Sequence, residues 1–115
     1  MQLISVVETP SYLADAERTM TEAERAAVID TLATNPAHGV LIKGTGGLRK
    51  MRTGLQGRGK RGGGRVVYWF HSEGYPVVLL AMFAKNEASD LTASERAALR
   101  RIADALLDDF RKKVQ

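Results

Sequence analysis

The sequence has no cysteine and only two histidines, His38 and His71. Without cysteine, disulfides, thiolate metal sites and a cysteine nucleophile are excluded. The two histidines stand at neither ligand nor triad spacing from a second ligating side chain. We therefore expect no metal site and place both imidazoles at the protein surface.

Long hydrophobic segments are also missing. No apolar run approaches the roughly 20 residues that span a bilayer, and the N-terminus lacks the basic and apolar regions of a signal peptide. We expect a cytoplasmic protein with no membrane partner. A length of 115 residues fits one domain, residues 1–115. A hydrophobic content of 44% supports one modest core but no deep cofactor cavity, so no cofactor is expected.

Positive charge is concentrated in one part of the chain. The segment from Lys43 to Arg65 carries eight cations and no acid, whereas the rest of the chain has nine cations and 13 acids. Ten of the eleven glycines lie between Gly39 and Gly64. Arginine binds phosphate through two parallel hydrogen bonds, and glycine lets a backbone approach closely. The segment therefore favours binding to the phosphate backbone of RNA or DNA over a plain solvated face.

The hydrophobic pattern predicts an α+β domain. Strands are expected at residues 3–8, 48–53, 65–72 and 77–84, with a short extended piece at 40–42. Helices are expected at 11–19, at about 21–33 and from 92 onward, the last two opened by Thr-x-x-Glu capping boxes. The order β-α-α-β-β-β-α, with hairpin-length links between the later strands, favours helices packed on a twisted antiparallel sheet. The last helix should bury one face, made of Leu99, Ile102, Ala103, Leu106 and Phe110.

Two phosphate-loop patterns occur in the glycine-rich segment. Residues 57–62 match the dinucleotide fingerprint, and residues 54–60 match most of a Walker loop. Both patterns need a strand before them and a helix after them, whereas this segment lies between two expected antiparallel strands. We interpret both as consequences of composition. Trp69 is interpreted as a core residue, with stacking on a base as the alternative.

A basic site of this kind can cleave RNA without a metal. The 2′-hydroxyl attacks the adjacent phosphorus and expels the 5′-oxygen, which requires a proton acceptor, a proton donor and neutralisation of the phosphorane. Like charge around a lysine lowers its pKa and makes the neutral amine available as a base. Arginines bind the developing negative charge. The composition is thus compatible with a ribonuclease but does not require one.

Several motifs taken together resemble the RelE/HigB family of toxins from type II toxin–antitoxin systems. They are residues 44–52 (GTGGLRKMR), 57–63 (GRGKRGG), 65–68 (RVVY) and 83–87 (FAKNE), with Asp90-Leu91, Glu8-Thr9-Pro10 and Asn35-Pro36-x-x-Gly39. The likeness covers nearly the whole chain and is greatest to the HigB-like branch. It implies helices on a twisted sheet and a metal-independent endoribonuclease that cleaves mRNA in the ribosomal A site. It also implies contact with rRNA, a helix-turn-helix antitoxin, and operator DNA bound only through that antitoxin.

The resemblance also implies site residues. Lys50 falls at the general base, Arg52 and Arg65 bind the phosphorane, and either Lys85 or Lys60 protonates the leaving oxygen. RNA binding is expected of a further set, Arg49, Arg58, Lys60, Arg61 and Asn86. The prototype of the family has a catalytic arginine and a tyrosine where this chain has Asn86 and Thr92.

Two other functions fit the same residues. The chain could be a non-catalytic module that binds nucleic acid or represses its operon together with its partner. It could also be a ParE-like toxin directed at gyrase. The cluster of lysine and arginine on the expected strands, however, is typical of the ribonucleases and favours them.

Overall fold

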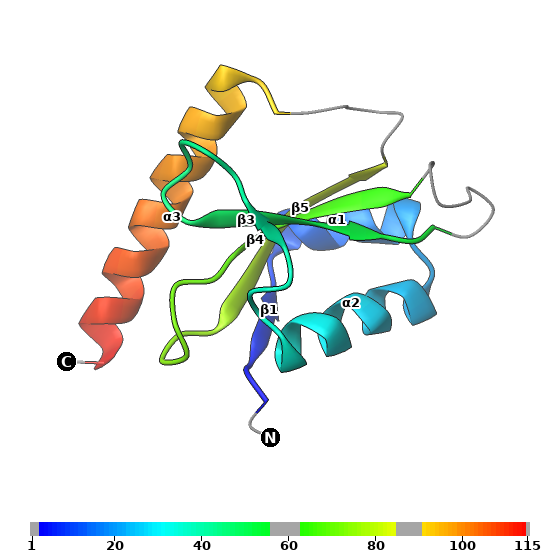
Figure 1. Cartoon of the computed structure of the whole chain (residues 1–115), viewed down its shortest axis with the longest axis horizontal. Helices are drawn as coiled ribbons and strands as arrows, with labels where there is room; N and C mark the ends of the chain where they lie inside the picture. The colour runs from blue at the N-terminus through cyan, green and yellow to red at the C-terminus, as the bar shows by residue number, and fades with distance from the viewer. Residues whose placement is uncertain (1–2, 56–62, 85–90, 115) are drawn as a thin grey trace.

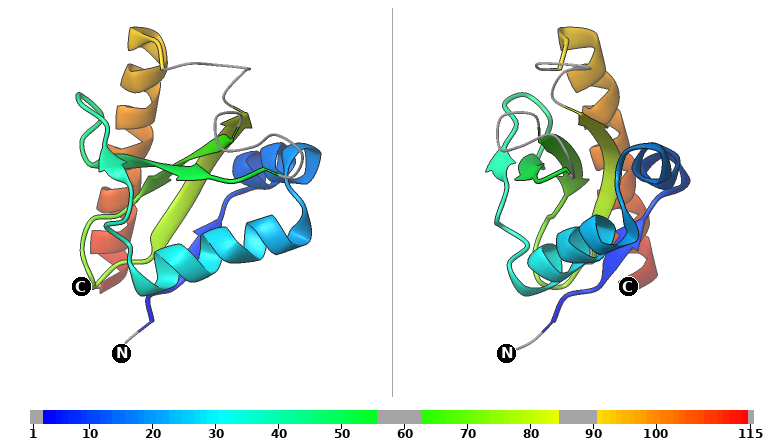
Figure 2. Two further views of the ribbon diagram at one scale, coloured as in Figure 1. Left: turned by 45° about the vertical axis from the view of Figure 1, so that its right-hand side comes forward. Right: turned by 90° about the vertical axis from the view of Figure 1, so that its right-hand side faces the viewer.

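The computed structural model of the chain consists of a five-stranded sheet with helices on both faces (Figure 1). It describes residues 3–55, 63–84 and 91–114. The strand order is β1-β5-β4-β3-β2. Helices α1 and α2 lie on one face of the sheet and α3 lies on the other (Figure 2). The predicted α+β class is confirmed.

The N-terminal elements are short and well capped. Strand β1 spans Val6–Glu8, α1 spans Pro10–Thr19 and α2 spans Glu22–Thr34. Proline occupies the first turn of α1 behind the Thr9 cap, as its missing N–H allows. At α2, Thr21 and Glu24 form the predicted capping box, with reciprocal bonds of 2.8 and 3.1 Å.

The sheet is mixed rather than wholly antiparallel. Strands β2 (Val40–Leu41), β3 (Leu48–Thr53), β4 (Gly64–Trp69) and β5 (Val77–Ala84) pair antiparallel in succession, as the hairpin-length links predicted. Strand β1 pairs parallel with β5. A parallel pair needs a long crossover, and all the residues between β1 and β5 supply it. Local sequence pattern carries no information about such a distant pairing.

Two predicted strands are longer than the observed ones. Leu48, the first residue of β3, pairs with Trp69, so residues 70–72 lie beyond the end of the ladder. Strand β1 begins at Val6 because its ladder with β5 begins where Val6 meets Val77. Both differences follow from where the neighbouring strand starts.

Each face of the sheet has its own core. Tyr12, Leu32 and Tyr68 belong to the core under α1 and α2, whereas Val67 and Trp69 belong to the core under α3. Strand β5 supplies both cores, as expected of a strand buried on both faces. Trp69 is 2% exposed and its ring centroid lies 5.8 Å from that of Phe110, which confirms the core interpretation.

Helix α3 covers the second face over Ala93–Val114. Thr92 and Glu95 form its predicted capping box, with bonds of 2.8 and 3.1 Å. Leu99, Ala103 and Phe110 pack in the core, but Ile102 is 43% exposed and is a correction to the predicted buried face. Leu106 packs against this core as predicted, and Leu107 packs there in place of Ile102. No helix in the described part of the chain is long and apolar enough to cross a membrane.

Candidate functional site

Three predicted catalytic cations lie on one face of neighbouring strands. Alternation along β3 places Lys50 and Arg52 on the same face. Arg52 lies directly opposite Arg65 of β4, and Lys50 lies opposite Val67, a member of the core under α3. The strand register therefore gathers Lys50, Arg52 and Arg65 on the α3 face of the sheet; we call these three residues the cationic cluster.

The cationic cluster lines an open cleft of about 540 Å³. The lining also includes His38, Gly39 and Val40, which lead into the edge strand β2. Arg52 and Arg65 also line a second hollow of about 300 Å³ beside Thr53, Gly54 and Gly63. Both hollows contain cations and no acid among their described lining residues. Such a concave, cationic surface attracts an anionic polymer.

Within the cluster, the three side chains differ in exposure. Arg52 is exposed, whereas Lys50 and Arg65 are half-buried. The Arg65 guanidinium donates a hydrogen bond of 3.1 Å to the Gly64 carbonyl. A guanidinium held against its own strand loses less side-chain freedom when it binds a phosphate.

Arg49 lies outside this cluster. It lies opposite Tyr68, a member of the core under α1 and α2, and so is on the other face of the sheet. Its guanidinium Nη1 donates to the carbonyl oxygens of Ala37 at 3.2 Å and Gly39 at 2.7 Å. The structure thus gives this predicted RNA-binding residue an internal role, in holding the chain that precedes β2.

Tyr68 of β4 binds the same turn, residues 36–39, through its hydroxyl group. Its hydroxyl donates to the Pro36 carbonyl and accepts from the Gly39 N–H, both at 2.8 Å. Burial raises the pKa of Tyr68, while the Gly39 hydrogen bond and the charge of Arg49 act in the opposite direction. Residues 36–39, which Arg49 and Tyr68 hold from the sheet, are called the anchored turn below.

His38 is the residue whose placement the sequence did not predict. It is exposed, as expected, but it belongs to the anchored turn and lines the cleft with the cationic cluster. The pairing of β2 with β3, which joins Val40 to Lys50, brings this imidazole to the cluster. The only sequence signal was the short apolar segment 40–42 before Lys43, which indicated an extended piece but not its partner strand.

The remaining predicted site residues lie outside the part of the chain that the structure describes; they are Arg58, Lys60, Arg61, Lys85 and Asn86. Thr92 is the N-cap of α3 and so has a structural role. Within the described ranges 3–55, 63–84 and 91–114, no three acidic or histidine side chains gather in a way that could hold a metal ion.

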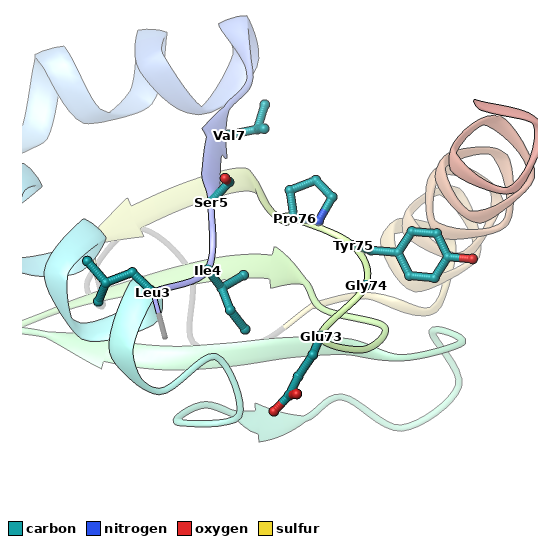
Figure 3. A pocket seen from close by; sticks show the side chains of 8 residues that line it. All are labelled: Leu3, Ile4, Ser5, Val7, Glu73, Gly74, Tyr75 and Pro76. Atoms are coloured by element: carbon teal, nitrogen blue, oxygen red, sulfur yellow. The ribbon is translucent and has the colours of Figure 1, made fainter. Parts of the chain in front are cut away.

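A second cleft opens at the opposite edge of the sheet. It lies between the N-terminal segment that leads into β1 and the turn that joins β4 to β5, and has a volume of about 480 Å³ (Figure 3). Leu3 and Val7 give it an apolar wall, and the charged side chain that lines it is the carboxylate of Glu73. This cleft lacks the charge that would bind phosphate.

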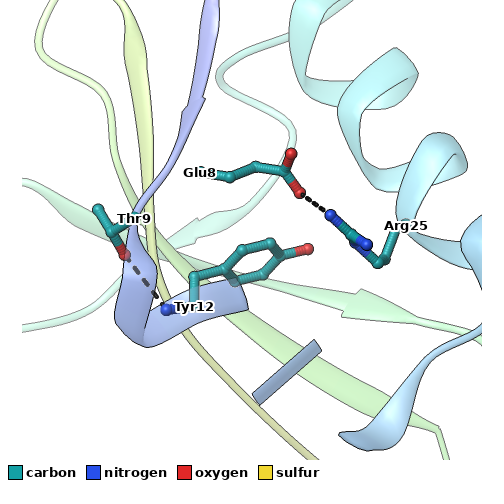
Figure 4. Close-up of polar contacts among 4 residues, drawn as sticks. All are labelled: Glu8, Thr9, Tyr12 and Arg25. Carbon is teal, nitrogen blue, oxygen red and sulfur yellow. Dashed lines mark hydrogen bonds and ion pairs between the residues drawn. The ribbon is translucent and has the colours of Figure 1, made fainter. Parts of the chain in front are cut away.

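Near α1, a half-buried polar cluster lies beside the sheet (Figure 4). Arg25 of α2 pairs with Glu8 of β1 at 3.3 Å, and the Tyr12 ring lies beside this pair. Burial and the Glu8 carboxylate raise the pKa of Tyr12 to about 12, with Arg25 acting in the opposite direction. Among the described residues, its hydroxyl has no hydrogen-bond partner. Tyr12 belongs to the core and the ion pair joins β1 to α2, so we assign the cluster to stability.

A small α+β protein with a strand-borne cationic cleft is suited to bind a polyanion. Comparison with protein families gives a match over residues 16–115 to the RelE toxin of the RelE/RelB toxin–antitoxin system. The protein therefore belongs to the RelE toxin family. Among solved structures, a double mutant of the E. coli toxin RelE in the free state superposes with a TM-score of 0.56. That match has 15% identity and covers 84% of this chain and 96% of the other, and it supports the fold.

Proposed function

We propose that this protein is a toxin that inhibits translation by cleaving mRNA on the ribosome. The observation that carries the proposal is the placement of Lys50, Arg52 and Arg65 on one sheet face, along an open cleft without acidic lining residues. Membership of a toxin family supports the biological context. A target on translating ribosomes also agrees with action in the cytoplasm.

The proposed reaction is attack of a 2′-hydroxyl on the adjacent phosphorus. Lys50 Nζ accepts the hydroxyl proton as the O2′–P bond forms, and Arg52 and Arg65 bind the phosphorane oxygens. The P–O5′ bond then breaks and the 5′-oxygen takes up a proton, leaving a 2′,3′-cyclic phosphate and a 5′-hydroxyl. The chain's own cations supply the charge that this transition state requires, and preorganised cations are most effective in that role.

Two classes of partner follow from the proposal. The substrate is mRNA in the ribosomal A site, with rRNA as the surrounding surface. The basic residues Arg58, Lys60 and Arg61, together with the amide of Asn86, are assigned to RNA contact. The second partner is a cognate antitoxin of helix-turn-helix type, through which operator DNA is bound. Lys85 and Lys60 stay as candidates for the proton donor that the sequence suggested.

Primer extension on a translated message after induction tests the proposal. Cleavage in phase with codons is expected. Intact message with blocked translation would favour a non-catalytic binding module instead, and a DNA damage response would favour a gyrase-directed toxin. Arg65→Ala should abolish cleavage and growth arrest while the protein stays folded. Arg101→Ala, which removes an exposed arginine of α3, is the matched control and should leave both intact.

A further inference from the structure

His38 and the cationic cluster face the same cleft from different segments of the chain. His38, Gly39 and Val40 line it at and before the edge strand β2, and Lys50, Arg52 and Arg65 line it from β3 and β4. The imidazole is exposed, so RNA bound along the cluster can reach it. Of the described residues that line this cleft, His38 is the one with an imidazole side chain.

The backbone on both sides of His38 is fixed by the sheet. Arg49 Nη1 donates to the carbonyl before it, that of Ala37, and to the carbonyl after it, that of Gly39. The Tyr68 hydroxyl spans the same turn, at 2.8 Å from both the Pro36 oxygen and the Gly39 nitrogen. The His38 N–H itself donates to the Asn35 carbonyl at 3.0 Å. These contacts preorganise the backbone that carries His38, as a catalytic group requires.

The proposed reaction needs a second group that transfers a proton. Once Lys50 has accepted the 2′-hydroxyl proton, a different residue must donate to the 5′-oxygen. Arginine stays protonated and is a poor donor of its proton, so Arg52 and Arg65 do not fill this role. An anionic phosphate beside an imidazole stabilises the protonated ring, which then carries the proton to be donated.

We propose that His38, in place of Lys85 or Lys60, is the general acid of this site, which rests on the proposed function. The imidazolium N–H gives its proton to the 5′-oxygen as the P–O5′ bond breaks, and the neutral imidazole and the 5′-hydroxyl are left. Arg49 and Tyr68 are positioning residues that act through the anchored turn. In this account the sheet face presents the base and the charge, and the turn before β2 presents the acid.

The test uses two synthetic messages on programmed ribosomes, with the full-length protein. One has the natural 5′-oxygen at the A-site cleavage position and the other has a bridging sulfur there. A thiolate leaves without being protonated, so it removes the need for a general acid. His38→Ala should cleave the oxygen message about 100-fold or more slowly than the unaltered protein. On the sulfur message it should cleave at nearly the unaltered rate.

Controls separate this proposal from the proposed function. His71→Ala removes the other histidine, which lies beyond the C-terminal end of β4. This variant should cleave both messages at the rate of the unaltered protein. Thermal unfolding should show that His38→Ala stays folded. Equal slowing of His38→Ala on both messages, or no slowing on the oxygen message, would overturn the role of His38 alone. Failure of the unaltered protein to cleave either message would overturn the ribonuclease function and the acid assignment together.

Discussion

Arg52 and Arg65 lie directly opposite each other on the antiparallel strands β3 and β4. Like charges at directly opposed positions destabilise a sheet, by an amount in the range of about 0.2–1 kcal/mol that cross-strand pairs contribute. A pair selected for stability alone would carry opposite charges or apolar side chains. The arrangement is explained if both guanidinium groups meet a phosphate, since bound anion removes the repulsion.

Neutralising either arginine should therefore stabilise the protein and inactivate it. Arg52→Gln and Arg65→Gln are each expected to raise the free energy of unfolding by about 0.2–1 kcal/mol. Each should also lose about 2–4 kcal/mol of transition-state stabilisation. Denaturant titration and ribosome-dependent cleavage measure the two effects.

A double-mutant cycle checks that repulsion is the cause. The two stabilising effects should be less than additive, because either substitution alone removes the like-charge contact. Arg101→Gln on α3 controls for the loss of one positive charge from the molecule. If the two gains in stability are additive, or if either substitution lowers stability, repulsion between the two arginines is not the cause.

Lys50→Arg distinguishes a proton acceptor from a plain positive charge. Arginine keeps the charge but does not deprotonate in proteins. If Lys50 is the base, Lys50→Arg should be as inactive as Lys50→Ala, with a loss of about 100-fold or more in cleavage rate. Binding to programmed ribosomes should fall only in Lys50→Ala. Near-normal cleavage by Lys50→Arg would instead make Lys50 an electrostatic residue.

Tyr68→Phe should loosen the anchored turn. The substitution removes one hydroxyl that serves both the Pro36 carbonyl and the Gly39 N–H. Leaving such groups unsatisfied costs about 1–3 kcal/mol. Amide hydrogen exchange at Gly39 should accelerate relative to exchange in α2. If His38 acts from this turn, cleavage should fall on the oxygen message and be largely restored on the sulfur message.

Gly39→Ala should disturb the same turn by crowding. A Cβ at Gly39 would lie 2.9 Å from the Lys50 carbonyl oxygen and 2.9 Å from the Tyr68 hydroxyl. The first of these is strand backbone and cannot move aside easily. We expect a loss of at least about 1 kcal/mol in stability, in the range of overpacking costs. Gly74→Ala is the control, because a Cβ there meets nothing within 4 Å, and it should unfold as the unaltered protein does.

Tyr12 should make stability fall at high pH. Its pKa in the folded protein is about 12, above its usual 10.0, so the folded state holds the proton more tightly than the unfolded state. The resulting stabilisation is fully present below pH 10 and is lost as pH rises through about 12. In Tyr12→Phe the decline between these values should be shallower. Near pH 7 the variant should be at least as stable, since the hydroxyl has no partner among the described residues.

The sequence predicted well those helix starts and strand bounds that depend on neighbouring residues in the chain. The capping residues Thr21 and Thr92 begin their helices as expected, and the bounds of β3 and β5 match the predicted ones. Ends that depend on a neighbour were less predictable: β4 stops at Trp69 because β3 starts at Leu48. The parallel pairing of β1 with β5 joins segments about 70 residues apart, which no local signal encodes.

The sequence by itself determined the chemistry available to this protein. Lysine and arginine are concentrated in one acid-free segment, and cysteine is absent. The alternation of residues along β3 places Lys50 and Arg52 on one face. Only the tertiary structure decided which side chains meet. Strand register set Arg65 against Arg52, turned Arg49 to the other face and brought His38 to the cleft. Register depends on packing between distant segments, and a shift of one residue would exchange the two faces.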